Sequence, residues 1–251
     1  MAWPFLQHDS SPLLFAHRGG NLATENTIDA FRLAKAAGYT YIETDIQLSQ
    51  DGVVVVFHDS TLNRLTGNPD YISDLTWAEL KDVQLRGGGT IPRLDEVLQQ
   101  FPNLKFNIDP KADRAVVPLA KIITQANAVD RVCVASFSGS RVKKIQRLLG
   151  PELCTAPGVA ATFWLVLRAV FTTRSQLRYA CIQVPNLFRP NRIGKWLVRR
   201  IQESGTQVHV WTPNSVDQIT RALDVGVDGI ITDEIELLQD LQSNHPRTTE
   251  T

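Results

Sequence analysis

Short apolar runs alternate with stretches of helical periodicity along the whole 251-residue chain. This alternation constrains the fold most, because repeated strand–helix units produce parallel strands joined by helical crossovers. In the first predicted helix, Ile28, Phe31 and Ala34 recur at helical spacing, with Thr27 as a capping residue before them and Gly38 where the helix should end. The predicted strands are Leu13–Ala16, Tyr41–Ile46, Val53–Phe57, Leu104–Ile108, Arg131–Ala135, Leu153–Thr155, Cys181–Val184, Val208–Trp211 and Gly229–Thr232.

Eight strand–helix units fit a TIM (β/α)8 barrel, with Val53–Phe57 as an extra strand that continues from the second one. Residues 60–91 do not follow the repeat and carry turn signals, so they are predicted to form a small insertion at the barrel mouth. A doubly wound open sheet is the alternative, although no GxGxxG motif follows the first strand. The length suits one domain, predicted over residues 1–242, with 243–251 as a frayed polar tail.

Composition limits the partners and the compartment. Lys plus Arg and Asp plus Glu number 26 each, so no net charge indicates a nucleic-acid partner. Cys133, Cys154 and Cys181 each lie in an apolar run at spacings that match no zinc motif, which indicates a reducing compartment. The N-terminus lacks a secretory pattern, and the longest apolar run is too short to span a membrane. We therefore expect a cytoplasmic protein; the sequence does not indicate its oligomeric state.

The stretch from Leu153 to Gln202 contains no acidic residue. It is interpreted either as solvated helix faces or as a surface that meets anions. The apolar segment 160–171 within it is correspondingly either a barrel helix with a wide buried face or an interfacial segment. The interfacial interpretation predicts peripheral membrane contact through residues 159–200. It rests on Phe163, Trp164, Phe171 and Trp196 beside the basic residues Arg168, Arg174, Arg178, Arg189, Arg192, Lys195, Arg199 and Arg200.

Charged side chains recur where successive predicted strands end. In a barrel these ends converge on one mouth, whereas the packed interior excludes unpaired charge. A lone histidine is more often structural than catalytic, and an Asp-Pro pair can be an ordinary turn, but their joint placement predicts a catalytic mouth. The residues in these positions are His17, Arg18, Glu43, Asp45, His58, Asp109 and Lys111.

The acidic residues among them predict a metal site. Glu43 and Asp45 point to the same side of their strand, because side chains alternate across a strand. Two carboxylates in one mouth repel each other unless a cation lies between them, and Asp109 from the neighbouring strand supplies a third ligand. All-oxygen ligation favours one divalent cation, Mg²⁺ or Ca²⁺.

The basic residues predict phosphate chemistry. His17 and His58 come from different strands and can flank a phosphorus atom, one as the base at the nucleophile and the other as the acid at the leaving oxygen. Arg18 and Lys111 supply fixed positive charge for phosphate oxygens.

The order of these motifs resembles that of the glycerophosphodiester phosphodiesterase family over nearly the whole chain. The resemblance implies a TIM barrel with a small mouth insertion. It also implies hydrolysis of glycerophosphodiesters to glycerol 3-phosphate and an alcohol, with a bound divalent cation and a cyclic phosphate formed by the glycerol 2-hydroxyl. The matching motifs are His17-Arg18-Gly19, Glu25-Asn26-Thr27, Glu43-x-Asp45, Asp51-Gly52, His58-Asp59, Leu62-x-Arg64-x-Thr66, Ile91-Pro92-x-Leu94, Val210-Trp211-Thr212-x-Asn214 and the run from Gly226 to Asp233.

The resemblance also implies roles for single residues: acid and base for the two histidines, metal ligation for Glu43 and Asp45, and phosphate contact for Arg18 and Lys111. It places Trp211 at the mouth, against glycerol or the leaving alcohol. Asp109 departs from the glutamate usual in the family, and Asn107-Ile108-Asp109-x-Lys111 resembles a branch with lysophospholipase D-type members, which makes lysophospholipids alternative substrates. A second hypothesis is a non-catalytic phospholipid-binding barrel. The histidine pair argues against it, because a protein that only binds needs no such pair.

Overall fold

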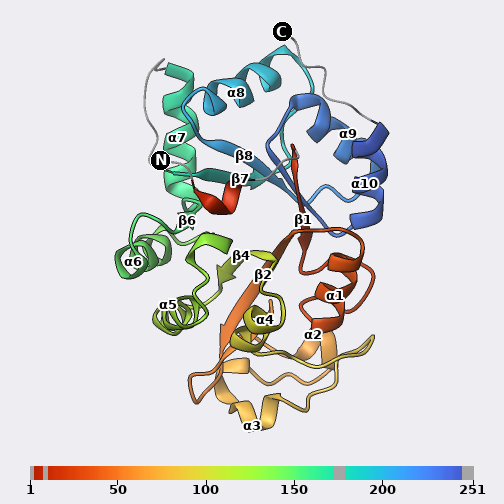
Figure 1. The fold of residues 1–251 in the computed structure, drawn as a ribbon, viewed down its shortest axis with the longest axis vertical. Coiled ribbons are helices and arrows are strands. Elements are labelled where there is room, and N and C mark those ends of the chain that lie inside the picture. Colours follow the sequence, from red (N-terminus) through yellow and green to blue (C-terminus); the bar gives the residue numbers. More distant parts are fainter. Residues whose placement is uncertain (1–2, 8–10, 172–178, 245–251) are drawn as a thin grey trace.

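The computed structural model describes residues 3–7, 11–171 and 179–244. Eight parallel strands form a nearly closed barrel (Figure 1), and a short extra strand, β3 (Val54–Val56), pairs with one of them in the antiparallel direction. The eight strands are β1 (Leu13–His17), β2 (Tyr41–Leu48), β4 (Lys105–Pro110), β5 (Val132–Val134), β6 (Cys154–Thr155), β7 (Cys181–Pro185), β8 (Gln207–Trp211) and β9 (Gly229–Thr232).

The strand order confirms the barrel. Hydrogen-bonded neighbours follow the order β6-β5-β4-β2-β1-β9-β8-β7, so the strands run around the sheet in chain order and the first lies beside the last. The doubly wound alternative is wrong, because such a sheet changes direction near its middle instead of returning to its start. Among the described residues, no ladder joins β6 to β7, and we call the gap between these two strands the seam.

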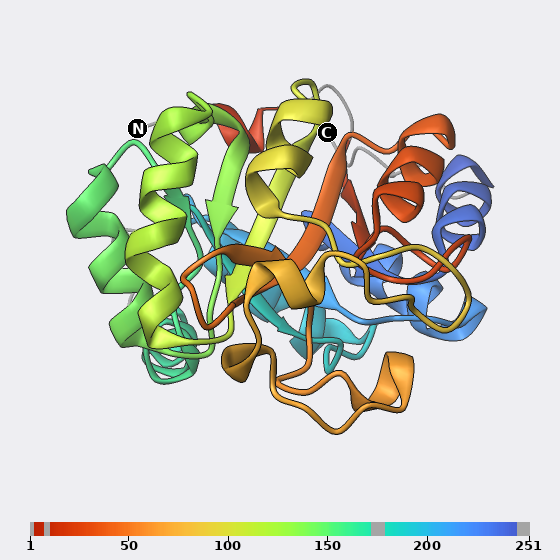
Figure 2. The ribbon, with the colours of Figure 1, turned by 90° about the horizontal axis from the view of Figure 1, so that it is seen from below.

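Helices surround the sheet (Figures 1 and 2). In the first of them, Thr27 is the N-cap and its hydroxyl accepts a hydrogen bond from the Ala30 amide, as its sequence predicts. Gly38, just beyond the helix end, has a φ of 90°. The barrel helices are α1 (Ile28–Ala36), α4 (Leu94–Gln100), α5 (Val116–Gln125), α6 (Gly139–Leu149), α7 (Val159–Phe171), α8 (Arg192–Gln202), α9 (Val216–Val225) and α10 (Ile235–Asn244).

Ser243 and Asn244 belong to α10, whereas the rest of the predicted tail lies outside the described residues. No helix in the described part of the chain is long and apolar enough to cross a membrane.

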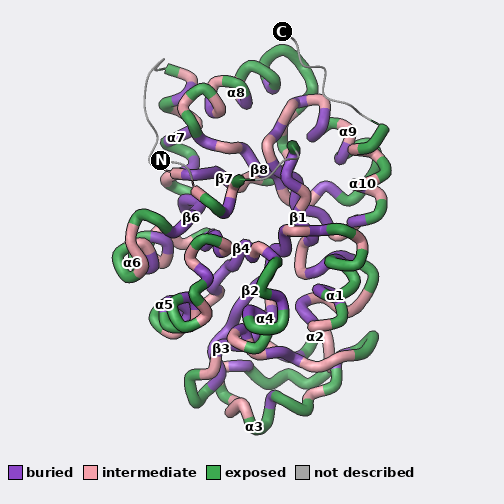
Figure 3. Tube along the Cα trace, in the orientation of Figure 1, coloured by how far each residue is buried: buried purple, intermediate pink, exposed green. Residues whose placement is uncertain are grey.

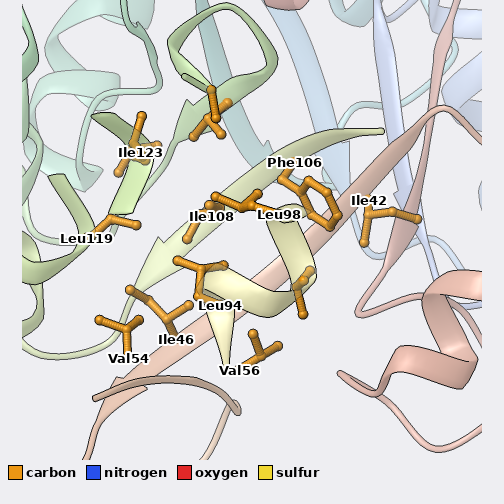
Figure 4. Close-up of a cluster of buried hydrophobic side chains, with 14 of the residues drawn as sticks. Ile42, Ile46, Val54, Val56, Leu94, Leu98, Phe106, Ile108, Leu119 and Ile123 are labelled. Carbon is orange, nitrogen blue, oxygen red and sulfur yellow. The ribbon is translucent and has the colours of Figure 1, made fainter. Parts of the chain in front are cut away.

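The main core lies between the strands and the outer helices (Figure 4). Outward-facing residues such as Ile42, Ile46 and Phe106 are fully buried against helix residues such as Leu94 and Leu119. The inward-facing residues of the same strands are therefore free to carry polar groups toward the mouth.

The two ends of the barrel are covered differently. At the amino end of the strands, the 3₁₀ turn η1 (Pro4–Leu6) packs Phe5 beneath Tyr41, whose hydroxyl donates to the Phe5 carbonyl at 2.7 Å. At the other end lies the predicted insertion, with α2 (Asn63–Thr66), η2 (Ile72–Asp74) and α3 (Trp77–Leu80). Figure 2 shows this segment, in orange, at the end toward which the strand arrows point. Leu62, Ile72 and Leu80 give it a small core of its own against β3.

Candidate active site

The carboxyl ends of β1, β2 and β4 bring the predicted residues to one mouth. His17 is the last residue of β1, and its ladder partner on β2 is Glu43. Asp45 on β2 is the ladder partner of Asp109 on β4. These carboxylates project inward because they alternate with Ile42, Thr44 and Ile46, as the strand period predicts.

His17 is held by an acidic residue from the far end of the chain. Its Nδ1 lies 2.7 Å from Asp233 Oδ1, directly after β9. Asn214 in turn donates to Asp233 Oδ2 and accepts from the Asp233 amide through its own Oδ1. Because a carboxylate only accepts hydrogen bonds, this contact places a proton on His17 Nδ1 and leaves Nε2 for the mouth.

The His17 imidazole is also close to Glu43, with 3.6 Å between Nε2 and Oε2. Burial lowers the pKa of His17, but Glu43 and Asp233 together outweigh burial and raise the pKa above its usual value. Burial, together with the adjacent Asp45, raises the pKa of Glu43. The pKa values of the His17 imidazole and the Glu43 carboxyl therefore lie closer together here than those of the free side chains.

Asp45 is the most heavily contacted carboxylate at the mouth. Its Oδ1 lies 2.7 Å from Lys111 Nζ, and its Oδ2 accepts from Asn26 and lies 3.0 Å from Arg18 Nε. Burial alone raises the pKa of Asp45, but Lys111 and Arg18 lower it below the usual range. Lys111 also contacts Asp109 Oδ2 at 2.7 Å, so its ammonium lies between the two acidic side chains.

Arg18 sits in a tight turn after β1 with a φ of 52°. Its amide donates to the Glu43 carbonyl and its guanidinium donates to Glu25, at 2.8 and 3.0 Å. The next residue, Gly19, has a φ of 91°, and a Cβ there would lie 2.7 Å from Ala30 Cβ. Glycine is thus required for the turn to pass this close to α1.

His58, which follows β3, has a matching arrangement. Its Nδ1 lies 2.6 Å from Asp59 Oδ1, and Asp59 Oδ2 accepts from Arg64 at 2.6 Å. Arg64 also donates two hydrogen bonds to Glu25, which reaches Arg18. A chain of charge pairs therefore connects the second histidine, through the insertion, to the turn after β1.

The other half of the mouth is apolar. Trp211 ends β8 and stacks edge-on against Phe137, which follows β5, with 5.7 Å between the ring centroids. Phe137 is 63% exposed, and Leu187 after β7 is 78% exposed. Val159, at the start of α7, adds a further exposed apolar side chain. Polar groups on β1, β2, β4 and β9 thus face a rim of aromatic and aliphatic groups from the β5 to β8 side.

Five residues of this site were assigned no role by sequence reasoning: Asn26, Asp59, Arg64, Asn214 and Asp233. Asp233 carries the same signal as His17, a charged group directly after an apolar strand, and the same rule identifies it. Arg64 lies in the short helix α2 of the insertion and Asn26 in the loop before α1, and no local sequence pattern predicts their partners.

The donor set suits a hard divalent cation. Glu43 Oε2 and Asp109 Oδ1 are buried and accept no hydrogen bond from any described residue. Carboxylate oxygens of this kind are the ligands that Mg²⁺ and Ca²⁺ prefer. Within the described chain, no three acidic or imidazole groups at the mouth bring ligand atoms within 4.8 Å of one another. A cation at Asp45 and Asp109 therefore competes with the Lys111 ammonium for the same two carboxylates.

Comparison with known proteins identifies relatives along nearly the whole chain. Residues 17–237 match the model of the glycerophosphoryl diester phosphodiesterase family. A Mycobacterium tuberculosis protein named "Probable glycerophosphodiester phosphodiesterase 2" is 34% identical over 94% of this chain and 92% of its own. Human lysophospholipase D GDPD3 is 26% identical over 92% of this chain and 85% of its own. The crystal structure of a Thermotoga maritima glycerophosphodiester phosphodiesterase is 28% identical, with a TM-score of 0.75 over 94% of this chain and 100% of that one.

Proposed function

Because this chain belongs to the glycerophosphoryl diester phosphodiesterase family, we propose that His17 and His58 are the acid and base with which it hydrolyses glycerol-linked phosphodiesters. One observation carries this assignment. Each imidazole is oriented by a carboxylate at Nδ1, Asp233 for the first and Asp59 for the second, which leaves Nε2 available on both. Such orientation by a third group is the arrangement that general acid–base catalysis requires.

The proposed reaction has two steps that use the histidines in opposite directions. First, the glycerol 2-hydroxyl attacks phosphorus while one imidazole takes its proton. The other imidazole gives a proton to the leaving alcohol oxygen, and a cyclic phosphate remains. Water then opens the cyclic phosphate, with each imidazole performing the reverse transfer, and glycerol 3-phosphate is released. Both histidines return to their starting protonation states, so the cycle balances.

Glu43, Asp45 and Asp109 are the residues that would hold a divalent cation, Mg²⁺ or Ca²⁺, which when bound supplies positive charge for the phosphate oxygens. Arg18 and Lys111 supply the remaining positive charge: Arg18 stays at Asp45 Oδ2, and Lys111, which contacts Asp45 and Asp109 here, would yield these carboxylates to the cation and turn to the phosphate. Trp211 is proposed to pack against glycerol or the leaving alcohol from the apolar side of the mouth.

The test is a product analysis with defined cations. Purified protein is incubated with glycerophosphocholine, glycerophosphoethanolamine or lysophosphatidylcholine, each with Mg²⁺, Ca²⁺ or EDTA. We expect glycerol 3-phosphate from the first two substrates with one of the cations and none with EDTA. Full activity in EDTA would contradict the carboxylate assignment. His58→Ala should abolish turnover while substrate binding is retained. The non-catalytic alternative predicts binding without turnover in the unmodified protein, and no observation supports it.

A lysophospholipid is the second candidate substrate, favoured by the apolar half of the mouth. Phe137, Trp211 and Leu187 offer a surface on which one acyl chain can lie while its phosphodiester meets the histidines. The human relative named lysophospholipase D supports this substrate class. Release of lysophosphatidic acid from lysophosphatidylcholine would establish it.

A lipid substrate leads us to propose an anionic membrane surface as the docking partner. The buried residues of α7 are Thr162, Leu165 and Ala169, and Val166 is partly buried against the core. Phe163 and Trp164 are more than 60% exposed on the same helix. Figure 3 shows exposed stretches along α7 and α8.

The neighbouring α8 adds exposed Ile193 and Trp196 together with the exposed basic residues Arg192 and Lys195. With no acidic residue from Leu153 to Gln202, this surface complements anionic lipid. Arg174 and Arg178 lie outside the described residues.

Sedimentation with phosphatidylcholine vesicles, with and without phosphatidylglycerol, tests the surface. We expect salt-sensitive binding to the anionic vesicles that Phe163→Ser and Trp164→Ser together remove. Tyr71→Ser, 54% exposed on the insertion, is the matched control and should bind normally. Equal binding by all variants would exclude this surface as the docking site, and no binding by the unmodified protein would exclude the membrane as the partner. A second copy of the chain would instead appear as a dimer that the double variant abolishes.

The proposed cytoplasmic location agrees with the three free cysteines.

A further inference from the structure

The three cysteines, separated in sequence by whole strand–helix units, meet inside the barrel. Cys133 lies on β5, Cys154 on β6 and Cys181 on β7. Their sulfur atoms all lie within 4.8 Å of one another, and each residue is at most 1% exposed. None of the three forms a disulfide. Among the described residues, this is the one group of three whose ligand atoms are close enough to share a metal ion.

The trio spans the seam of the barrel. Cys133 and Cys154 are ladder partners on adjacent strands. Cys181 stands on the far side of the gap between β6 and β7, which no ladder bridges in the described part of the chain. A ligand shared by all three sulfurs would therefore connect two strands that backbone hydrogen bonds leave unconnected.

A buried imidazole provides the independent observation. His209 on β8 is fully buried, and its Nε2 lies 3.0 Å from Gln207 Oε1. Its Nδ1 has no hydrogen-bond partner among the described residues. A Cβ added at Gly229 on β9 would lie 2.6 Å from His209 Cδ2, so glycine makes room for the ring on that side. His209 belongs to β8, which pairs with the strand of Cys181, β7.

We propose that Cys133, Cys154 and Cys181 bind one zinc ion inside the barrel, with His209 as the fourth ligand; because neither of its ring nitrogens lies within 4.8 Å of all three sulfurs, the His209 ring must move toward them when the ion binds. Three sulfurs and one imidazole nitrogen form a common tetrahedral zinc site. In such a site, with Zn–S bonds of about 2.3 Å, the sulfurs lie roughly 3.8 Å apart, so the thiols need to draw together by about 1 Å at most. The ion joins β5, β6, β7 and β8 and has a structural role that is separate from the mouth.

Buried cysteines often serve as small apolar residues. Packing alone, however, requires neither three sulfurs facing one another nor an unpartnered imidazole nitrogen beside them, since a buried polar atom without a partner is destabilising.

Metal content and cobalt spectroscopy test the site without reference to activity. The full chain is unfolded with reductant and chelator, refolded with Zn²⁺, Co²⁺ or neither, and passed through gel filtration. We expect one tightly held metal per chain, a thiolate-to-cobalt charge-transfer band, and a higher melting temperature for the zinc-refolded protein than for the metal-free one. The Cys181→Ser protein should lose the charge-transfer band.

Glu43→Gln is the matched control, because it alters the carboxylates at the mouth and leaves the thiols intact. It should keep the cobalt band. Refolded unmodified protein that holds no zinc and melts at the same temperature with and without it would overturn the proposal, even if Cys181→Ser itself failed to fold. Fewer than three thiols titrating in unreduced, unfolded protein would also overturn it, because two cysteines would then form a disulfide.

Discussion

Replacement of Asp233 by asparagine tests how His17 is held. Two donors converge on this carboxylate: the His17 Nδ1 proton at one oxygen and the Asn214 amide at the other. An asparagine side chain has one oxygen and one NH2 group, so it can accept from only one of them. Either His17 loses its partner and turns to the other tautomer, or Asn214 is displaced from the turn after β8.

A hydrogen bond to a charged group contributes about 1.5–3 kcal/mol. If that free energy is lost from the transition state, kcat/KM falls by about 10- to 150-fold, since each 1.36 kcal/mol is tenfold. The assay follows glycerol 3-phosphate released from glycerophosphocholine. Asp217→Asn, on the exposed start of α9, is the control and should retain full activity.

The same substitution in a His17→Ala background separates positioning from folding. With the imidazole absent, Asp233→Asn has nothing left to misplace, and the residual rate should stay the same. A loss below about threefold in the unmodified background, or an equal loss in both backgrounds, would refute the assigned role of Asp233.

Three other substitutions test the surroundings of the site. Gly19→Ala should destabilise the protein by more than Gly52→Ala in thermal melts. Both glycines have φ near 90°, but a Cβ at Gly52 meets nothing within 4 Å. The Gly52→Ala protein therefore has only the backbone strain, about 1–2 kcal/mol. Equal shifts would contradict the close approach to α1. Phe106→Ala should cost about 3–5 kcal/mol in chemical denaturation, and Val117→Ala, 37% exposed, less than about 0.5 kcal/mol. Arg64→Ala should lower kcat/KM about fivefold, as expected for roughly 1 kcal/mol of ion pairing, and Arg221→Ala not at all; identical rates would show that the charge chain from His58 to Arg18 has no catalytic effect.

The sequence predicts the strands well because their signal is local. Val53–Phe57 is apolar throughout and Tyr41–Ile46 alternates around Glu43 and Asp45, and all nine predicted strands are present to within about two residues at each end. The candidate site follows from the same signal. In a barrel, a charged residue on the inward face near the carboxyl end of a strand points into the mouth, so the positions of Glu43, Asp45 and Asp109 follow from the strand pattern without any knowledge of their contacts.

Contacts between distant segments depend on closure of the ring. His17 meets Asp233 only because β1 lies beside β9, and no local pattern in either segment encodes the other. The thiol cluster is the clearest case. Cys133, Cys154 and Cys181 match no metal motif in sequence, since such motifs are spacings within one turn or hairpin. Parallel strands place residues of successive units side by side at the same level of the barrel. The three sulfurs come together only when the sheet curls and closes, because closure brings β7 back beside β6 and β5.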